Sequence, residues 1–101
     1  MNIQDQNQLE QEIVDRLQTV IDPETGADVL RMRLVEDLTV NSNGGVRYTF
    51  RPSSTLCPIA VYLVQQIKLA VAEVPGVTNQ TITVSDYAAA EELTKLINQE
   101  I

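Results

Sequence analysis

The sequence predicts an α+β fold: a two-layer sandwich in which helices cover one face of a small, mixed three-stranded sheet. Hydrophobic residues recur at helical spacing in three segments and alternate with polar residues in three shorter ones, in the order α-β-β-α-β-α. A chain of 101 residues is long enough for one domain and too short for two. Residues 1–101 are therefore expected to share a single core.

The first predicted helix runs from about residue 7 to about residue 21. Acidic residues separate its apolar positions, which share one face: Leu9, Ile13, Leu17, Val20 and Ile21. Pro23 is expected to end this helix, because the residue before a proline is pushed away from helical backbone angles.

A β-hairpin is the clearest local prediction. The segments LVEDLTV and VRYTFRP alternate apolar and polar residues on either side of NSNGG, a typical hairpin tip. A short third strand, TITV, is predicted at residues 81–84. If it lies parallel to the second strand, the connection between them should be right-handed.

Two further helices are predicted. The stronger one carries a continuous apolar stripe, formed by Ile59, Leu63, Ile67, Ala70, Val71 and Val74. Pro and Gly in the segment VPGV end it. The last helix is expected over about residues 87–101, with Ser85 or Asp86 as its N-cap.

The charge and cysteine content exclude several classes of protein. Seven basic and fourteen acidic residues give a net charge of −7, which argues against binding to nucleic acid or to an anionic membrane surface. Such acidity suits a soluble protein or one that meets a basic partner. One cysteine, no signal-peptide pattern and no apolar run of roughly 20 residues lead us to expect a cytoplasmic protein. The absence of histidine rules out a Ser-His-Asp or Cys-His apparatus within the chain.

Cys57 is the first candidate functional residue, because Pro58 follows it and an apolar helix begins there. Proline favours the first helical position, so Cys57 is predicted to be the N-cap or within one residue of it. Free backbone N–H groups and the helix dipole would then favour a thiolate, which is a nucleophile and a soft metal ligand. The alternative is that Cys57 is a small buried hydrophobe.

Asp22 and Glu24 form the second candidate group, in the segment DPETG. In one interpretation the segment is only a turn, in which Asp caps and Pro and Gly set the backbone. In the other, the two carboxylates join Cys57 in a mixed oxygen and sulfur metal site. One cysteine is far short of the four that hold a common iron–sulfur cluster, so any cluster must be shared with another chain or held transiently.

Four motifs, taken in order, resemble the small iron–sulfur assembly domain of the SufT and PaaD group. They are the DPE turn, the strand entry LVED, the loop TLCP and the helix exit PGV, and the resemblance covers about residues 9–84. Arg33 stands where the family often has glycine. The segment after the third strand, expected to be helical over about residues 87–101, replaces a tryptophan-rich tail that many members carry.

The resemblance implies a role in maturing iron–sulfur proteins as an adaptor or transient carrier, not as an enzyme. It makes Cys57 the reactive cysteine and Thr55 the polar residue that donates to it, while Asp22 and Glu24 belong to the acidic turn. The implied cargo is a transient iron–sulfur cluster or iron, with none expected in the resting protein. The implied partners are the assembly machinery or apo client proteins, and a homodimer would bring two thiols together.

Two alternatives remain open from the sequence. The first is a protein-interaction module that uses a strand edge or the terminal helix, with Cys57 purely structural. The second is a thiol enzyme, which the absence of histidine and of an obvious second base disfavours.

Overall fold

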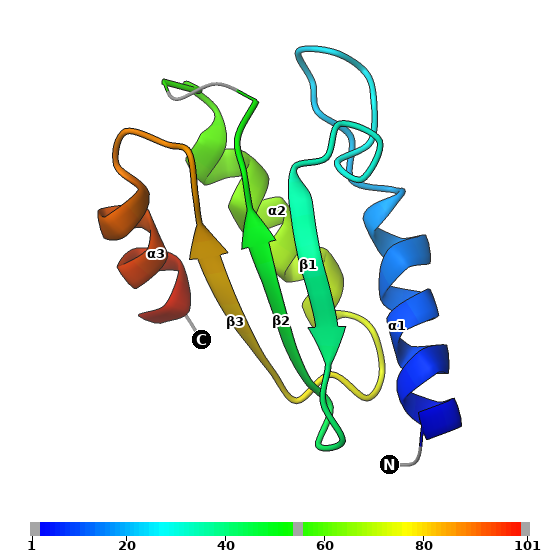
Figure 1. The fold of residues 1–101 in the computed structure, drawn as a ribbon. Coiled ribbons are helices and arrows are strands. Elements are labelled where there is room, and N and C mark those ends of the chain that lie inside the picture. The colour runs from blue at the N-terminus through cyan, green and yellow to red at the C-terminus, as the bar shows by residue number, and fades with distance from the viewer. Residues whose placement is uncertain (1–2, 54–55, 100–101) are drawn as a thin grey trace.

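The computed structural model describes residues 3–53 and 56–99. The predicted α+β class and the order of elements are confirmed (Figure 1). The elements are α1 (Ile3–Leu17), β1 (Val35–Val40), β2 (Gly45–Phe50), α2 (Ala60–Ala72), β3 (Asn79–Val84) and α3 (Ala90–Gln99). Within this part of the chain, no helix combines the length and the apolar character needed to cross a membrane.

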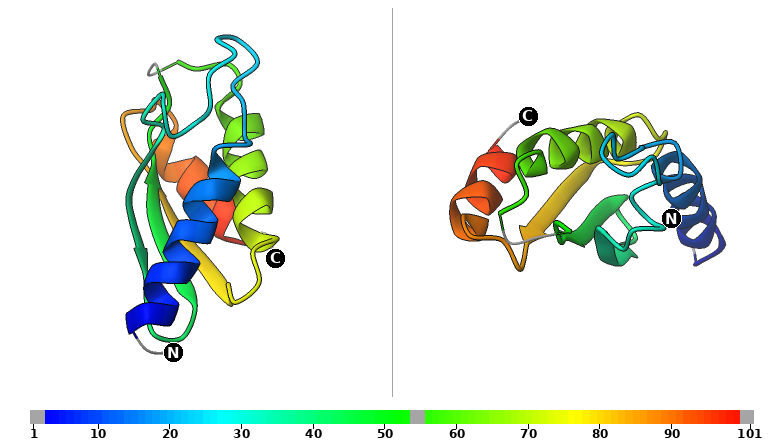
Figure 2. Two further views of the ribbon diagram at one scale, coloured as in Figure 1. Left: turned by 90° about the vertical axis from the view of Figure 1, so that its right-hand side faces the viewer. Right: turned by 90° about the horizontal axis from the view of Figure 1, so that it is seen from above.

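The three strands form one mixed sheet in the order β1-β2-β3. β1 pairs with β2 in antiparallel orientation, and β3 pairs with β2 in parallel. α2 covers one face of the sheet, while α1 lies beside β1 and α3 beside β3 (Figure 2). In Figure 1 the chain leaves β2, passes behind the sheet through α2 and returns as β3 on the left, which is the expected right-handed connection.

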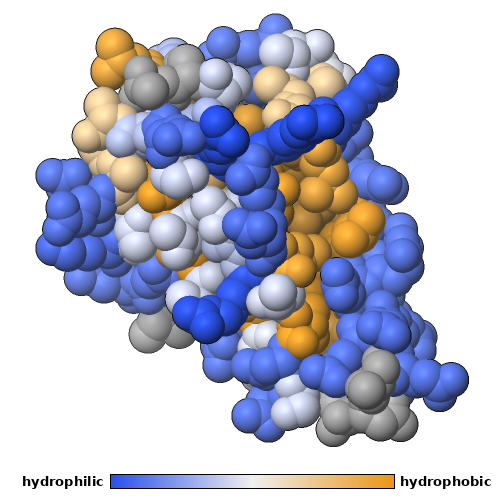
Figure 3. Space-filling model, viewed as in Figure 1, coloured by the Kyte–Doolittle hydropathy of each residue, from blue (hydrophilic) through white to orange (hydrophobic). Residues whose placement is uncertain are grey.

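The core lies between β2 and α2. Alternate residues of β2 point toward the helix, so that Val46, Tyr48 and Phe50 are all buried. They meet the apolar stripe of α2, in which Leu63 and Ile67 are sealed from solvent. The opposite face of the sheet is more polar. Figure 3 shows this face, with an apolar stripe next to it in the region of β1 and α1.

A β-bulge in β1 was not predicted. Val35 pairs with Phe50 and Val40 pairs with Val46, so five steps along β1 match four along β2. The extra residue falls where Asp37 adopts a φ of 55°. Without it, Val35 and Val40 would point to opposite faces, because side chains alternate along a strand.

Both terminal helices differ from the prediction at their ends. α1 begins earlier than expected and ends at Leu17, because Val20 already belongs to the next loop, where its carbonyl accepts a hydrogen bond from the Val29 N–H at 3.0 Å. α3 begins at Ala90, so the predicted caps Ser85 and Asp86 lie too far upstream. Both of those residues have partners outside α3.

Asp86 accepts an ion-paired hydrogen bond from Arg51 Nε at 2.7 Å, and the Ser85 N–H donates to the Phe50 carbonyl at 3.0 Å. The residues after β3 therefore extend its contact with the end of β2 before α3 begins. The N-cap prediction was wrong because it considered only local sequence, whereas both residues are held by a neighbouring strand.

α3 covers the outer edge of β3 with polar side chains. The Asn98 side-chain amide pairs with both backbone groups of Ile82: its oxygen accepts from the N–H at 2.9 Å and its nitrogen donates to the carbonyl at 2.7 Å. The Thr94 hydroxyl accepts from the Val84 N–H at 3.0 Å. These contacts occupy edge groups that an added strand would need.

The hairpin tip is locked against the loop between α2 and β3. Gly44 has a φ of 82°, which favours glycine, and its carbonyl accepts from the Thr78 N–H at 2.9 Å. A Cβ at this position would lie 2.2 Å from the Gly76 carbonyl oxygen. Gly26 also has a positive φ, 75°, but a Cβ there would meet nothing within 4 Å.

Gly44→Ala is therefore expected to lower the free energy of unfolding by at least about 2 kcal/mol, since backbone strain and a backbone clash add. Gly26→Ala is the matched control, with strain alone, and should cost about 1 kcal/mol. Urea unfolding followed by circular dichroism measures both. Equal losses in the two variants would contradict the close approach of the two loops.

Side-chain hydrogen bonds also connect the sheet to α2. The buried Tyr48 hydroxyl donates to Gln80 Oε1 at 2.7 Å, and Gln80 Nε2 donates to the Lys68 carbonyl at 2.9 Å. Desolvation by burial raises the pKa of the Tyr48 phenol well above its ordinary value. The neutral phenol is thus the form that the fold stabilises.

Stability should consequently fall as pH rises above about 10, where the unfolded phenol ionises and the folded one still holds its proton. Tyr48→Phe should flatten this decline, at a cost of about 1 kcal/mol at neutral pH because Gln80 loses its donor. Denaturant unfolding between neutral and alkaline pH tests this, with Tyr62→Phe on the exposed side of α2 as control. An unchanged alkaline slope in Tyr48→Phe would exclude the phenol as its source.

Candidate functional site at the Cys57 loop

The two candidate segments of the sequence lie at the same end of the molecule, where β2 ends and α2 begins (Figures 1 and 2). The Arg51 N–H, directly after β2, donates to the Leu34 carbonyl at 2.8 Å and joins the end of β2 to the residue before β1. A hollow of about 320 Å³ lies at this end of the sheet, lined by residues 32–34, Glu36 and residues 51–53. Neither the DPETG turn nor Cys57 lines it.

Asp22 organises its own turn. Its carboxylate accepts the Glu24 N–H at 2.8 Å, and its carbonyl accepts the Gly26 N–H at 2.8 Å. The Asp22 side chain is only 2% exposed, whereas Glu24 points to solvent. The geometry therefore matches the turn interpretation of DPETG, in which a short carboxylate satisfies the backbone of the bend.

Cys57 is buried, with 5% of its surface exposed, and belongs to the hydrophobic core. Its predicted place as helix N-cap was wrong, because α2 begins at Ala60 and its N-cap is Ile59, whose φ of −111° and ψ of 15° are not helical. A single turn precedes the helix, closed by the Ala60 N–H donating to the Cys57 carbonyl at 3.4 Å. The sulfur is not at the surface in this conformation.

No group of three or more Cys, Asp or Glu residues that could hold a metal ion occurs among the residues that the structure describes. Cys57, Asp22 and Glu24 are all described, so this conformation does not gather them as a ready-made ligand set. Thr55 lies outside the described residues. The assignment of these four residues to a cluster or metal stays a prediction.

Arg51 lies at the centre of a small charged cluster beside the Cys57 loop. Its guanidinium bonds Glu36 at 3.4 Å and Asp86 at 2.7 Å. The positive charge of Arg51 is thus paired with carboxylates from β1 and from the segment after β3. The predicted hairpin brings Glu36 close to Arg51, whereas nothing in the sequence indicated Asp86, which lies far from Arg51 along the chain.

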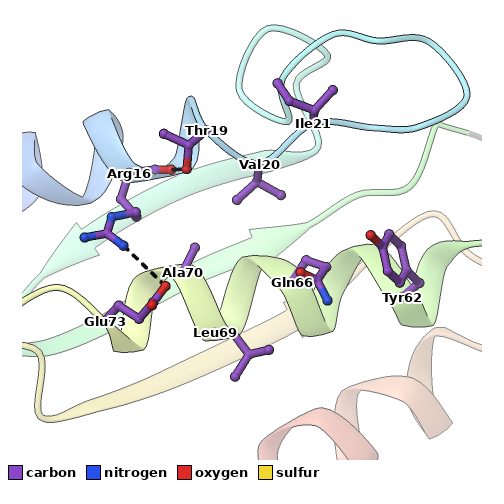
Figure 4. A pocket seen from close by; sticks show the side chains of 9 residues that line it. All are labelled: Arg16, Thr19, Val20, Ile21, Tyr62, Gln66, Leu69, Ala70 and Glu73. Carbon is purple, nitrogen blue, oxygen red and sulfur yellow. Dashed lines mark hydrogen bonds and ion pairs between the residues drawn. The ribbon is translucent and has the colours of Figure 1, made fainter.

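A second hollow, of about 510 Å³, lies between the end of α1 and the outward face of α2 (Figure 4). Ile21, Tyr62 and Leu69 line it and remain about half exposed. The Arg16 guanidinium and the Glu73 carboxylate form an ion pair at one end of it, at 3.3 Å. The sequence did carry a signal for this site: Tyr62 and Leu69 are large apolar residues outside the predicted buried stripe of α2.

Comparisons with known proteins point to one family. The sequence model of the family described as "Iron-sulfur cluster assembly protein" matches residues 10–84. The Fe-S protein maturation auxiliary factor YitW of Bacillus subtilis is 32% identical over 74 residues, which cover 73% of this chain and 72% of that protein. The Fe-S protein maturation auxiliary factor SufT of Staphylococcus aureus is 29% identical over 65 residues, which cover 64% and 74%.

The fold is similar to a solved structure as well. The crystal structure of a domain of unknown function, DUF59, from Bacillus anthracis superimposes with a TM-score of 0.74. The match covers 95% of this chain and 93% of that one, at 28% sequence identity. The similarity therefore extends over α3 as well as over the part that the family model covers.

Because Cys57 is buried, its thiol is expected to react slowly. Its reaction with an aromatic disulfide reagent should be at least about tenfold slower in the native protein than in denaturant at the same pH, because the loop must open first. A thiol moved to the neighbouring position, in Leu56→Cys with Cys57→Ala, is the control, since Leu56 is 76% exposed. Equal native rates for the two positions would show that Cys57 is open in solution.

Proposed function

Because this chain belongs to the iron–sulfur cluster assembly protein family, we propose that it is an accessory factor in the maturation of iron–sulfur proteins. It acts as an adaptor or transient carrier between the assembly machinery and apo client proteins, and does not catalyse a small-molecule reaction. Relatives named as auxiliary maturation factors in Bacillus subtilis and Staphylococcus aureus support this role.

The observation that carries the proposal is the position of Cys57 in a turn closed by a long hydrogen bond. The Ala60 N–H lies 3.4 Å from the Cys57 carbonyl, compared with the usual 2.9–3.0 Å. A weak closing bond lowers the free-energy cost of opening the turn. In the proposed mechanism the loop opens and presents the sulfur, which becomes a transient ligand or a docking thiol.

The cluster or iron is cargo in this proposal. One cysteine supplies one ligand, so the client or the machinery provides the others. Asp22 holds the backbone of the DPETG turn, and Glu24, exposed on the same turn, is a secondary oxygen ligand. Thr55 donates to the thiolate in the opened loop.

A second candidate function follows from the burial of Cys57 itself. In an interaction module that holds no cargo, a sulfur that is 5% exposed is a small apolar filler of the core. The two proposals differ in what they require of the sulfur, since only the first needs a thiol.

Replacing the Cys57 thiol distinguishes the two candidate functions. Cys57→Ala keeps the site apolar and small, so the variant should fold, with a loss of stability of about 1 kcal/mol. In cells that lack the native protein, it should leave the activity of an iron–sulfur client at the level of the deletion strain. Client activity and the iron content of the purified client are the measurements.

Cys57→Ser is the second variant. It places a polar hydroxyl in the same buried position, so its stability reports how well the fold tolerates a polar group there. Full client activity with Cys57→Ala would remove the thiol from the mechanism and favour the interaction module. Equal client activity with and without the gene would reject a role in maturation altogether.

A further inference from the structure

A trough runs along the surface between α1 and α2. The hollow of Figure 4 continues into a second one, of about 290 Å³, which is lined by Glu12, Asp15 and the segment Val74–Pro75. Arg16 and Thr19 line both hollows and join them. The trough therefore has two different halves, one at the start of α2 and one at its end.

The half near the start of α2 combines large apolar side chains with polar ones such as Gln66. Ile21 comes from the loop after α1, while Tyr62 and Leu69 come from two turns of α2 that face away from the sheet. In Figure 4 both side chains project from α2, and Leu69 points to the side opposite Thr19 and Val20. Large apolar side chains that stay exposed together on one surface mark interaction sites more often than singly scattered ones.

The other half is acidic. Glu12 and Asp15 on α1 line the second hollow, and Glu73 at the end of α2 lines the adjoining end of the first. Arg16 is the one cation among the lining residues of the two hollows. The Arg16–Glu73 pair is solvent-exposed on both sides and so contributes little to stability. A cation from another molecule can replace Arg16 at Glu73 with little loss.

We propose that this trough is a docking site for a basic amphipathic helix of a partner protein. The partner's apolar residues pack on Tyr62 and Leu69, and its Lys or Arg residues meet Glu12, Asp15 and Glu73. From Tyr62 to Glu73 the trough follows about 16 Å of helix axis, the length of about three turns. A groove between helices that presents large apolar side chains is a common binding site for an amphipathic helix.

A second copy of this chain does not fit the trough as well. Each copy carries a net charge of −7, so pairing two copies through the trough would bring like charges together. A basic partner gains from the same charges. This inference rests on the proposed function, since it takes the partner to be a protein of the maturation pathway.

The first test uses a synthetic amphipathic peptide of leucine and lysine, about three turns long. Its binding to the full chain is followed by fluorescence anisotropy. Leu69→Gln should weaken binding roughly tenfold, because it removes an apolar anchor from the trough. Leu96→Gln, at an exposed leucine of α3, is the matched control and should change binding less than about twofold.

Charge is tested in the same assay. Glu12→Gln with Asp15→Asn should weaken binding and reduce its dependence on salt. Glu91→Gln with Glu92→Gln makes the same change of net charge on α3, away from the trough. Equal losses with the two pairs, or with Leu69→Gln and Leu96→Gln, would mean that the peptide follows net charge alone, and the docking site would be rejected.

The client assay then distinguishes this inference from the proposed function. Leu69→Gln should lower client activity in cells, while Leu96→Gln should not. If Cys57→Ala abolishes client activity and Leu69→Gln leaves it intact, the trough proposal fails and the maturation role stands. If deletion of the gene has no effect on the client, the maturation role fails, and the peptide assay still decides whether the trough binds basic helices.

Discussion

The pairing of β2 on both sides is the constraint on which the rest of the structure depends. β2 is hydrogen-bonded to β1 along one edge and to β3 along the other, and its alternate side chains form the floor of the core. The parallel pair requires a crossover, and α2 supplies it while covering the apolar face. At the far end of β2, the Phe50 carbonyl and the Arg51 N–H hold the segments after β3 and before β1. Three loops therefore meet where Cys57 lies.

The burial of Cys57 sets the terms of its proposed chemistry. A thiol inside the core is protected from solvent and from casual oxidation, whereas a transient ligand must be exposed. In the proposed mechanism, a turn closed by a long hydrogen bond satisfies both conditions, because it opens and closes again. The Asp22 turn is held by three hydrogen bonds of 2.8–2.9 Å, which join Asp22 to Glu24, Gly26 and Ala27.

The two ends of α2 and its outward face carry the surfaces proposed for function, while both edges of the sheet are poorly suited to adding a strand. Asn98 and Thr94 of α3 occupy backbone groups at the outer edge of β3, so that edge is a poor site for adding a strand. The bulge at Asp37 distorts the other edge of the sheet. α1 and α3 lie at opposite edges of the sheet, with α2 between them and in contact with both (Figure 2).

The sequence by itself determined the fold class, the order of the elements, the hairpin tip and the family motifs, because periodicity and turn chemistry are local properties. The tertiary structure decided what depends on distant residues: the end of α1 at Leu17, the pairing of Asp86 with Arg51, the bulge and the burial of Cys57. The sequence and the structure agree at Arg33. Its φ of 60° lies in the left-handed region, which explains why glycine suits that position. The trough likewise needed the packing of α1 on α2, because its walls come from segments far apart in the chain.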